Sequence, residues 1–414
     1  MRAPPRLRSR APSGTDAPPA LLVGLDSLSG LQAARLLAAR GVRVIAIASN
    51  PRHPACRTRV CDRILFADSD GEELIELLLG LGQRGDAGVV LPCTDRAVRA
   101  LSRHRDRLEP AHTIPLPDHR TVETLLDKAA FAVYATREGL PIPRTALLED
   151  RDDAGRAGEE LRFPCVVKPG FKSAEWLREV ERKVIRVATP AELLEVHGRF
   201  GHLADVFVAQ EWIEGDDSAL YSCTASFDRD GRPLASLVYR KLRQWPPETG
   251  NGTLTVECRN DAVREQTLRL FGDLRCHGFG DLEMKRDART GELLITEPNV
   301  GRPVGLSPLA EACGVELLAT VYRDAAGLPL PANRTQRPSG IKWVYLRNDL
   351  RSALALRREG RLTVRDWMRS LRGRRTHAVL SLRDPLPLLD DLWRIARKLA
   401  RRAAPAQPES TTGR

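Results

Sequence analysis

Apolar runs and amphipathic stretches alternate over the first hundred residues of the chain. Residues 20–25 form an apolar run that ends in a glycine turn, which is typical of a buried parallel strand. Residues 29–40 carry helical periodicity, and residues 42–48 are a second apolar run. A strand, a turn, a helix and a strand within about thirty residues predict a βαβ unit of a doubly wound sheet. Residues 87–92 supply a further strand.

The turn after the first strand lacks the fingerprint of dinucleotide-binding proteins. Gly24 and Gly30 are separated by five residues, whereas that fingerprint is G-x-G-x-x-G, and the second strand is not followed by an acid. We therefore expect a Rossmann-like domain without a dinucleotide site. Asp95 follows the strand at 87–92, where it either faces a ligand at the carboxyl edge of the sheet or caps the next helix.

The pattern changes near residue 121. Asp127 and Lys128 open a helix, and a short apolar strand ends in Lys168. The next strands are expected at 205–215, 221–227 and 233–239, and a helix at 262–277. The basic, Pro/Gly-rich stretch 240–252 is predicted to be a mobile loop that covers the site.

Two acids and an asparagine converge on a hairpin near the end of this region. Segments 281–286 and 292–299 flank a turn whose glycine can adopt a positive φ. If the hairpin is centred near Arg289, Glu283 lies opposite Ile295. Side chains alternate along a strand, so a polar and an apolar set face opposite ways. The polar set is Glu283, Glu297 and Asn299, and the apolar set is Leu282, Met284 and Leu294.

This polar set favours a metal–nucleotide site. Hard cations such as Mg²⁺ prefer oxygen ligands and commonly take few carboxylates, because substrate phosphates supply the rest. The alternative is a solvated acidic edge, which the neighbouring Arg302 makes the weaker interpretation.

Composition excludes several classes of protein. A chain of 414 residues accommodates two or three domains. The net charge of +11 is dispersed and only 5% of residues are aromatic, so we expect no nucleic-acid partner. The eight cysteines lack metal-ligand or redox spacing, which favours a reducing cytoplasm. No apolar run approaches the ~20 residues of a membrane span, and residues 1–19 are expected to be a disordered leader.

Beyond residue 331 the composition shifts to arginine-rich helices, predicted at 349–358, 363–371 and 386–402. The last is amphipathic with a basic end. Such a helix either covers a neighbouring domain or lies on an anionic membrane surface. We favour the first interpretation, because it is the more common one.

The order of these motifs resembles that of the ATP-grasp superfamily of ADP-forming ligases. Residues 279–302 look like its closing signature, Glu-x-Asn-x-x-Arg, with the arginine displaced by one residue from the commonest form. The spacing is most similar to that of carboxylate–amine ligases related to D-aspartate ligase and carbamoyl-phosphate synthase. The motifs, in order, are Asp127-Lys128, Val166-Val-Lys168-Pro, residues 208–217, Arg240-Lys241, Glu283 and Glu297-Pro-Asn-Val-Gly-Arg302.

The resemblance implies an α/β and α+β architecture. A Rossmann-like pre-ATP-grasp domain (20–120) would precede the ATP-grasp fold (121–330), followed by a helical C-terminal extension (331–402) and a disordered tail (403–414).

The resemblance also implies roles for individual side chains, with ATP and Mg²⁺ (or Mn²⁺) as cofactors. Lys128 and Lys168 would bind phosphates, residues 210–213 would bind adenine, and the hairpin acids would bind the metal. Lys241 and Arg243 would reach the γ-phosphate or the substrate carboxylate, and Arg302 would neutralise the transferring phosphoryl group. For an isolated lysine the alternative is a solvated surface role, and for Trp212 it is core packing. The nucleotide set is Lys128, Lys168, Gln210, Glu211, Trp212, Ile213 and Asp217 (or Asp216); the metal set is Glu283, Glu297 and Asn299; the catalytic set is Lys241, Arg243 and Arg302.

One segment departs from the family pattern. Many relatives carry a glycine-rich loop after the strand lysine, whereas residues 170–183 are glycine-poor. Lys172, Ser173 or Lys183 could substitute for that loop at the phosphates.

The resemblance implies ATP-dependent, ADP-forming ligation of a carboxylate to an amine through an acyl phosphate. Both substrates would be small molecules or peptides whose identity no motif encodes, and an oligomer is left open. One alternative is a catalytically degenerate nucleotide-binding scaffold, which the intact hairpin disfavours. Another is an NAD(P)-dependent oxidoreductase, which the missing fingerprint disfavours.

Overall fold

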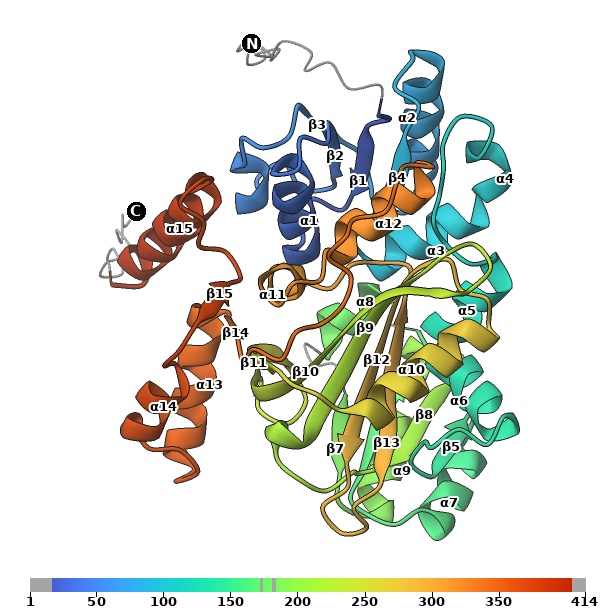
Figure 1. Cartoon of the computed structure of the whole chain (residues 1–414). Coiled ribbons are helices and arrows are strands. Elements are labelled where there is room, and N and C mark those ends of the chain that lie inside the picture. Colours follow the sequence, from blue (N-terminus) through green and yellow to red (C-terminus); the bar gives the residue numbers. More distant parts are fainter. Residues whose placement is uncertain (1–16, 172–173, 181–183, 404–414) are drawn as a thin grey trace, which may run out of the picture.

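The computed structural model describes residues 17–171, 174–180 and 184–403. Three β-sheets organise this part of the chain (Figure 1). The first is parallel, with strand order β3-β2-β1-β4, and confirms the predicted doubly wound start. Its strands are β1 (Ala20–Val23), β2 (Val44–Ala48), β3 (Arg63–Phe66) and β4 (Val89–Pro92), and its helices are α1 (Leu28–Ala38), α2 (Glu72–Gln83), α3 (Asp95–Arg103) and α4 (Arg105–Leu108).

Gly24 and Gly30 serve helix–strand packing at the first turn. A Cβ at Gly30 would lie 2.2 Å from the carbonyl oxygen of Gly24, so only a residue without a side chain lets α1 start this close to β1. Two residues assigned to the disordered leader are instead hydrogen-bonded to the folded part: Pro18 accepts from the Tyr322 hydroxyl and Pro19 from the Val89 amide. Residues 1–16 lie outside the described part.

The second sheet is antiparallel and small, with strand order β5-β8-β6-β7. Its hydrophobic core includes the fully buried Trp176 and is separate from the cores of the other sheets. Two helices, α5 (His119–Leu126) and α6 (Lys128–Arg137), lead into it, and Asp127 caps α6 as predicted. The remaining elements are β5 (Thr145–Leu148), α7 (Arg151–Glu160), β6 (Cys165–Pro169), α8 (Ala174–Glu179), β7 (Ile185–Val187), α9 (Pro190–Phe200), η2 (Gly201–Leu203) and β8 (Phe207–Glu211).

The third sheet has seven strands, in the order β13-β12-β9-β10-β11-β14-β15, and is antiparallel except where β14 meets β15. Helix α10 packs on one of its faces (Figure 1). The elements are η3 (Asp217–Ala219), β9 (Leu220–Phe227), β10 (Pro233–Trp245), β11 (Asn251–Glu257), α10 (Asp261–Asp273), β12 (Gly278–Arg286), β13 (Leu293–Val300), α11 (Ser307–Ala312) and α12 (Leu317–Ala325).

The prediction of a mobile loop at 240–252 is wrong. Strand β10 continues to Trp245 and β11 begins at Asn251, so only five residues connect them. Pairing with β9 and then with β11 supplies the backbone hydrogen bonds that hold this basic stretch extended.

The register of the metal hairpin also differs from the prediction. Glu283 pairs directly with Glu297, whereas Met284 pairs with Ile295, so Thr296 is the extra residue of a β-bulge. The bulge reverses the alternation beyond it. Ile295 therefore shares the core face of Met284, and Leu294, predicted to lie there, pairs with Lys285 instead.

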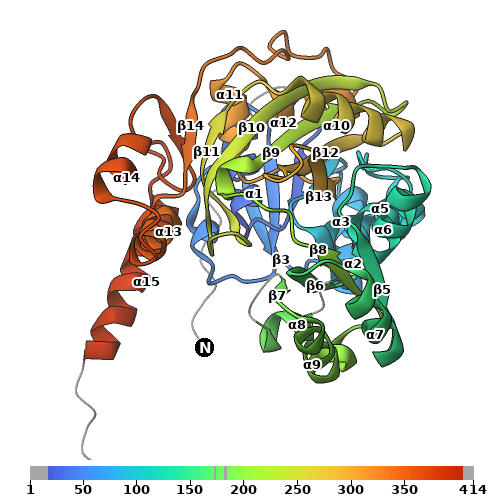
Figure 2. The same cartoon turned by 90° about the horizontal axis from the view of Figure 1, so that it is seen from below.

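The C-terminal extension contains the three predicted helices, α13 (Leu346–Arg358), α14 (Val364–Ser370) and α15 (Leu386–Ala403). Two strands that the sequence pattern did not predict, β14 (Lys342–Val344) and β15 (Arg375–His377), continue the third sheet. The helices lie on the side of the molecule opposite α5 and α6 (Figures 1 and 2). Helix α15 contacts the 3₁₀ helix η1 (Pro54–Arg57), as expected of a helix that covers a neighbouring domain.

Two hydrophobic cores join the first sheet to the third. One includes Val98 and Phe271, and the other includes Leu37 and Trp343. No helix in the described ranges is both long and apolar enough to cross a membrane.

Candidate functional site

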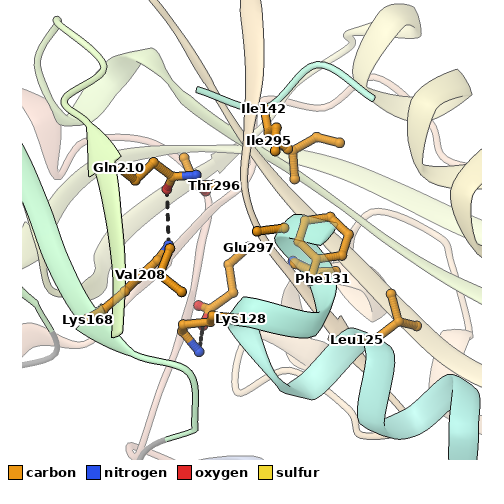
Figure 3. A pocket seen from close by; sticks show the side chains of 12 residues that line it. Leu125, Lys128, Phe131, Ile142, Lys168, Val208, Gln210, Ile295, Thr296 and Glu297 are labelled. Atoms are coloured by element: carbon orange, nitrogen blue, oxygen red, sulfur yellow. Dashed lines mark hydrogen bonds and ion pairs between the residues drawn. The ribbon is translucent and has the colours of Figure 1, made fainter. Parts of the chain in front are cut away.

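A cavity of about 600 Å³ is lined by residues of the second and third sheets and of helices α1 and α3, which follow strands of the first sheet. The second sheet contributes Lys168 and Gln210, and the third contributes the acidic hairpin. Asp95, at the start of α3, brings the first sheet to the same cavity. A smaller pocket beside it is lined by apolar side chains such as Phe131 and Ile142 (Figure 3).

The three predicted metal ligands lie together, and each contacts a cation. Lys128 Nζ is 3.1 Å from Glu297 Oε1 (Figure 3), Lys241 forms an ion pair with Glu283, and Arg302 donates to Asn299 Oδ1 at 2.8 Å. Side-chain oxygens that attract three cationic groups also suit a hard divalent metal. No group of three or more His, Cys, Asp or Glu side chains with metal-binding geometry occurs among the described residues. Two carboxylates and an amide would leave the remaining positions of Mg²⁺ to phosphates and water.

Lys168 and Gln210 face the hairpin from the second sheet. The Lys168 ammonium donates to Gln210 Oε1 at 3.1 Å, and the Gln210 amide donates to the Thr145 hydroxyl at 2.9 Å (Figure 3 shows the first of these bonds). Both side chains are buried. An ammonium group that lines the cavity can bind a phosphate oxygen there.

The residues predicted to bind adenine line the wall that continues from β8. Arg162 holds Glu211 at 3.1 Å. The Arg186 guanidinium lies 4.8 Å from the centroid of the Trp212 ring, and the Lys285 ammonium lies 4.9 Å from it. Lys285 also donates to the Ile213 carbonyl at 2.8 Å. Burial lowers the pKa of Lys285.

Two predicted site residues have other partners. Asp217 accepts three hydrogen bonds, from the backbone and side-chain amides of Gln244 and from the backbone of Glu248, and it does not line the cavity. It therefore anchors the turn between β10 and β11, and Glu248 is the acid that reaches the cavity there.

Arg243 also points away from the cavity. Its guanidinium donates to both oxygens of Asp349 at 2.8 and 2.9 Å and to the Ser370 hydroxyl at 2.9 Å. Arg243 and Asp349 are buried, so this pair connects β10 to the C-terminal extension. The prediction that Arg243 reaches a phosphate or the substrate is corrected accordingly, because α13 supplies an acid that the sequence pattern did not place beside it.

Arg302 lies where the first and third sheets meet. It forms an ion pair with Asp95, while Thr94 caps α3, so Asp95 has a cavity position rather than the capping role considered for it. Burial opposes ionisation of Asp95, but the Arg302 guanidinium lowers the pKa of that carboxyl on balance. The arginine that follows β13 is thus held in position by an acid of α3, which follows the first sheet's strand β4.

The sequence pattern missed several cavity residues. Tyr239 donates its hydroxyl hydrogen to Asp281 at 2.9 Å, and burial raises the pKa of Asp281 to about 7. Lys285 precedes the turn of the hairpin and could have been recognised by its alternation with Glu283. The other missed residues include Thr255 on β11, Trp343 on β14, and Tyr345 and Asn348 near the start of α13. Lys172, Ser173 and Lys183, considered as substitutes for a glycine-rich loop, lie outside the described residues.

The arrangement suits the binding of a triphosphate with its metal. Four cationic side chains and two carboxylates converge on one cavity, so negative phosphates and a divalent cation can both be neutralised there. Apolar side chains such as Phe131 and Ile142 line only the smaller pocket beside this cavity. These cations are Lys128, Lys168, Lys241 and Arg302, and these carboxylates are Glu283 and Glu297. Lys285, Asp95, Glu211 and Glu248 also line the cavity.

Comparison with known sequences gives distant relatives, while no family model matches the chain. It is 26% identical over 223 residues to the D-aspartate ligase of Enterococcus faecium, a match covering 51% of the chain and 52% of that protein. It is 27% identical over 150 residues to the carbamoyl phosphate synthase large chain of a Mycobacterium species, covering 34% of the chain and 13% of that protein. The formate-dependent phosphoribosylglycinamide formyltransferase of Ignicoccus hospitalis is 23% identical over 340 residues, covering 78% of the chain and 79% of that protein. The chain thus aligns with about half of the first relative's length and a small part of the second's.

Solved structures share the fold. The biotin carboxylase domain of the Hydrogenobacter thermophilus 2-oxoglutarate carboxylase, in complex with MgADP and bicarbonate, superposes with a TM-score of 0.61 at 15% identity, covering 77% of this chain and 72% of that one. The ADP complex of N5-carboxyaminoimidazole synthetase from Staphylococcus aureus gives a TM-score of 0.59 at 16% identity, covering 78% and 80%.

Proposed function

The chain belongs to the ATP-grasp superfamily, and from this premise we propose that it is an ATP-dependent, ADP-forming carboxylate–amine ligase. The observation that carries the proposal is the convergence of two carboxylates, an asparagine and four cations on one cavity. A degenerate scaffold would have no need to retain this complete set.

Separate groups of side chains would bind the phosphates, the metal and the adenine. Lys128 and Lys168 would bind the phosphates of ATP, and Glu283, Glu297 and Asn299 would hold Mg²⁺. When bound, the metal supplies positive charge at the phosphate oxygens. Trp212 and Ile213 would form the apolar wall for adenine. Neither Asp217 nor Arg243 belongs to this set.

Two steps complete the reaction. A substrate carboxylate oxygen attacks the γ-phosphorus, the bond from that phosphorus to the β,γ-bridging oxygen breaks, and ADP leaves. The amine then attacks the acyl carbon, the bond from that carbon to the phosphate oxygen breaks, and phosphate leaves as the nitrogen loses a proton. Arg302 and Lys241 would neutralise charge on the transferring phosphoryl group. Exclusion of water from the site during the reaction would protect the acyl phosphate.

Trapping with hydroxylamine tests this proposal. We expect the correct carboxylate with MgATP and hydroxylamine to yield a hydroxamate and an equal amount of ADP, because hydroxylamine replaces the natural amine. AMP as the nucleotide product would overturn the mechanism even if ligation occurred.

The state of the cysteines supports the proposal of a cytoplasmic location. All eight cysteines are free, and burial raises the thiol pKa of Cys61, Cys93 and Cys223 to about 12. Thiols so protected from ionisation suit a reducing compartment. Non-reducing and reducing electrophoresis of freshly isolated protein would give identical mobilities if this holds.

A further inference from the structure

Three polar atoms on one wall of the cavity are buried without a partner among the described residues. They are the Thr255 hydroxyl, the Trp343 indole nitrogen and the Asn348 side-chain oxygen. Thr255 is 0% exposed and Trp343 is 3% exposed. A buried polar group that makes no hydrogen bond costs free energy, so these atoms are expected to meet a partner that is not part of the chain.

Thr255, Trp343 and Asn348 all line the cavity, and we call these three residues the Thr255 subsite. Thr255 pairs with Trp343 across β11 and β14, and on its other side with Lys241 of β10. Directly opposed residues in neighbouring strands present their side chains side by side on the same face. Asn348 lies in the first turns of α13, which follows β14 directly. The subsite therefore occupies the same floor of the cavity as Lys241.

The chemistry of the subsite indicates what it binds. The Trp343 indole only donates, the Thr255 hydroxyl donates and accepts, and the Asn348 amide group complements another amide. None of these groups carries a charge. A free carboxylate or ammonium would find no counter-ion among them, whereas a peptide group offers a carbonyl to accept from the indole and an N–H to donate.

The distance from the phosphates indicates the size of that ligand. Lys241, which contacts the metal-site acid Glu283, lies two strands away from Trp343, or about 10 Å at 4.7–4.9 Å per strand. Extended peptide covers about 3.3–3.6 Å per residue. A substrate that reacts near Lys241 and also reaches Trp343 must therefore be about three residues long.

We propose that the Thr255 subsite binds a peptide group of a tripeptide-sized substrate, and that the C-terminal extension thereby selects peptides over free amino acids. This inference rests on the proposed ligase function, and it names the class of one substrate of that same cavity. It also gives β14 and α13 a role in recognition beyond closing the sheet.

A substrate panel provides the first test. ADP release with MgATP is measured for tripeptides and, separately, for the free amino acids of which they are composed. We expect tripeptides to give a KM at least about tenfold lower, which corresponds to one hydrogen bond in a buried site. Equal or lower KM values for the free amino acids would overturn the inference.

Substitutions provide the second test. Thr255→Val removes the hydroxyl at nearly constant volume, and we expect the KM for the best tripeptide to rise about tenfold while the KM for ATP is unchanged. Thr255→Ser should restore binding, and Trp343→Phe should repeat the effect of the valine. Because the hydroxyl has no partner without ligand, Thr255→Val should not lower the melting temperature.

Ser226→Ala is the matched control. Ser226 also has a fully buried, unpartnered hydroxyl on the third sheet, but it does not line the cavity. If Thr255→Val changed the KM no more than this control does, the subsite would not exist.

Separate outcomes distinguish this inference from the proposed function. A protein that binds MgATP but releases no ADP with any peptide would retain the nucleotide site and lose the peptide assignment. A protein that does not bind MgATP at all would overturn the proposed function itself.

Discussion

Glu297 is the residue at which the metal, the phosphates and Lys128 would meet. We expect Glu297→Gln to lower kcat/KM for MgATP by about 100-fold or more, because a neutral ligand neutralises less charge on the metal. The side chain is partly exposed and makes an ion pair at 3.1 Å, so the melting temperature should change by no more than about 2 °C. Glu292→Gln, an exposed acid of the same hairpin, is the control and should leave turnover unchanged. ADP release at the wild-type rate in Glu297→Gln would exclude the metal role.

We expect the buried ion pair between Arg243 and Asp349 to stabilise the fold rather than to bind a ligand. Asp349 is fully buried and accepts from Arg243, Thr253 and Trp367, so its removal leaves a buried guanidinium without its counter-ion. We expect Asp349→Leu to lower the free energy of unfolding by about 3–5 kcal/mol. Arg243→Met combined with Asp349→Leu should recover part of that loss, measured as a double-mutant cycle in denaturant. Weaker MgATP binding in Arg243→Met with unchanged stability would instead favour a role at the site.

At the scale of elements, Glu257 at the end of β11 holds the segment that leads into β14. It accepts from the Gln336 amide and from the backbone of Ser339 and Gly340 at 2.5–2.8 Å. Burial alone would raise the pKa of Glu257, but these hydrogen bonds lower it on balance. An acid with a lowered folded-state pKa stabilises the protein above its unfolded pKa, near 4.3, and loses that contribution as the pH falls through the folded value.

We therefore expect Glu257→Gln to lower the free energy of unfolding by about 1–3 kcal/mol at pH 7, since an amide replaces one acceptor with a donor. The difference from wild type should shrink as the pH falls below about 4. Melting temperatures between pH 3.5 and 8 measure it, with Glu265→Gln on the exposed face of α10 as the control. A difference that stayed constant across this range would show that ionisation of Glu257 contributes nothing.

At the scale of the whole molecule, the second sheet has its own hydrophobic core, whereas the first and third sheets share theirs. A nucleotide held by Lys168 on one side and Glu297 on the other would connect these two bodies. MgATP at 100 times its Kd should stabilise the protein by about 2.7 kcal/mol. Thermal melting should show a smaller shift with ATP plus EDTA, and little shift in Lys168→Ala. Lys398→Ala, on the exposed face of α15, is the matched control. Equal shifts with and without chelator would count against a metal at the hairpin.

The local sequence pattern was sufficient to predict features that depend on residues close together in the chain. Alternation along β12 and β13 placed Glu283, Glu297 and Asn299 on one face, and all three line the cavity. The Asp127 cap and the βαβ start follow from contacts within a few residues. The order of the motifs along the chain indicated the resemblance to the ATP-grasp superfamily, because that order reflects the positions of strands around a common cavity.

Only the tertiary structure decided which partners the remaining side chains meet. The bulge at Thr296 moved Leu294 off the core face, and pairing with β9 and β11 turned the expected loop at 240–252 into strand. Arg243 meets an acid 106 residues further along the chain, and Thr255 is joined by Trp343 from an unpredicted strand. Pairing between distant strands depends on the packing of the whole sheet, and no local periodicity encodes it.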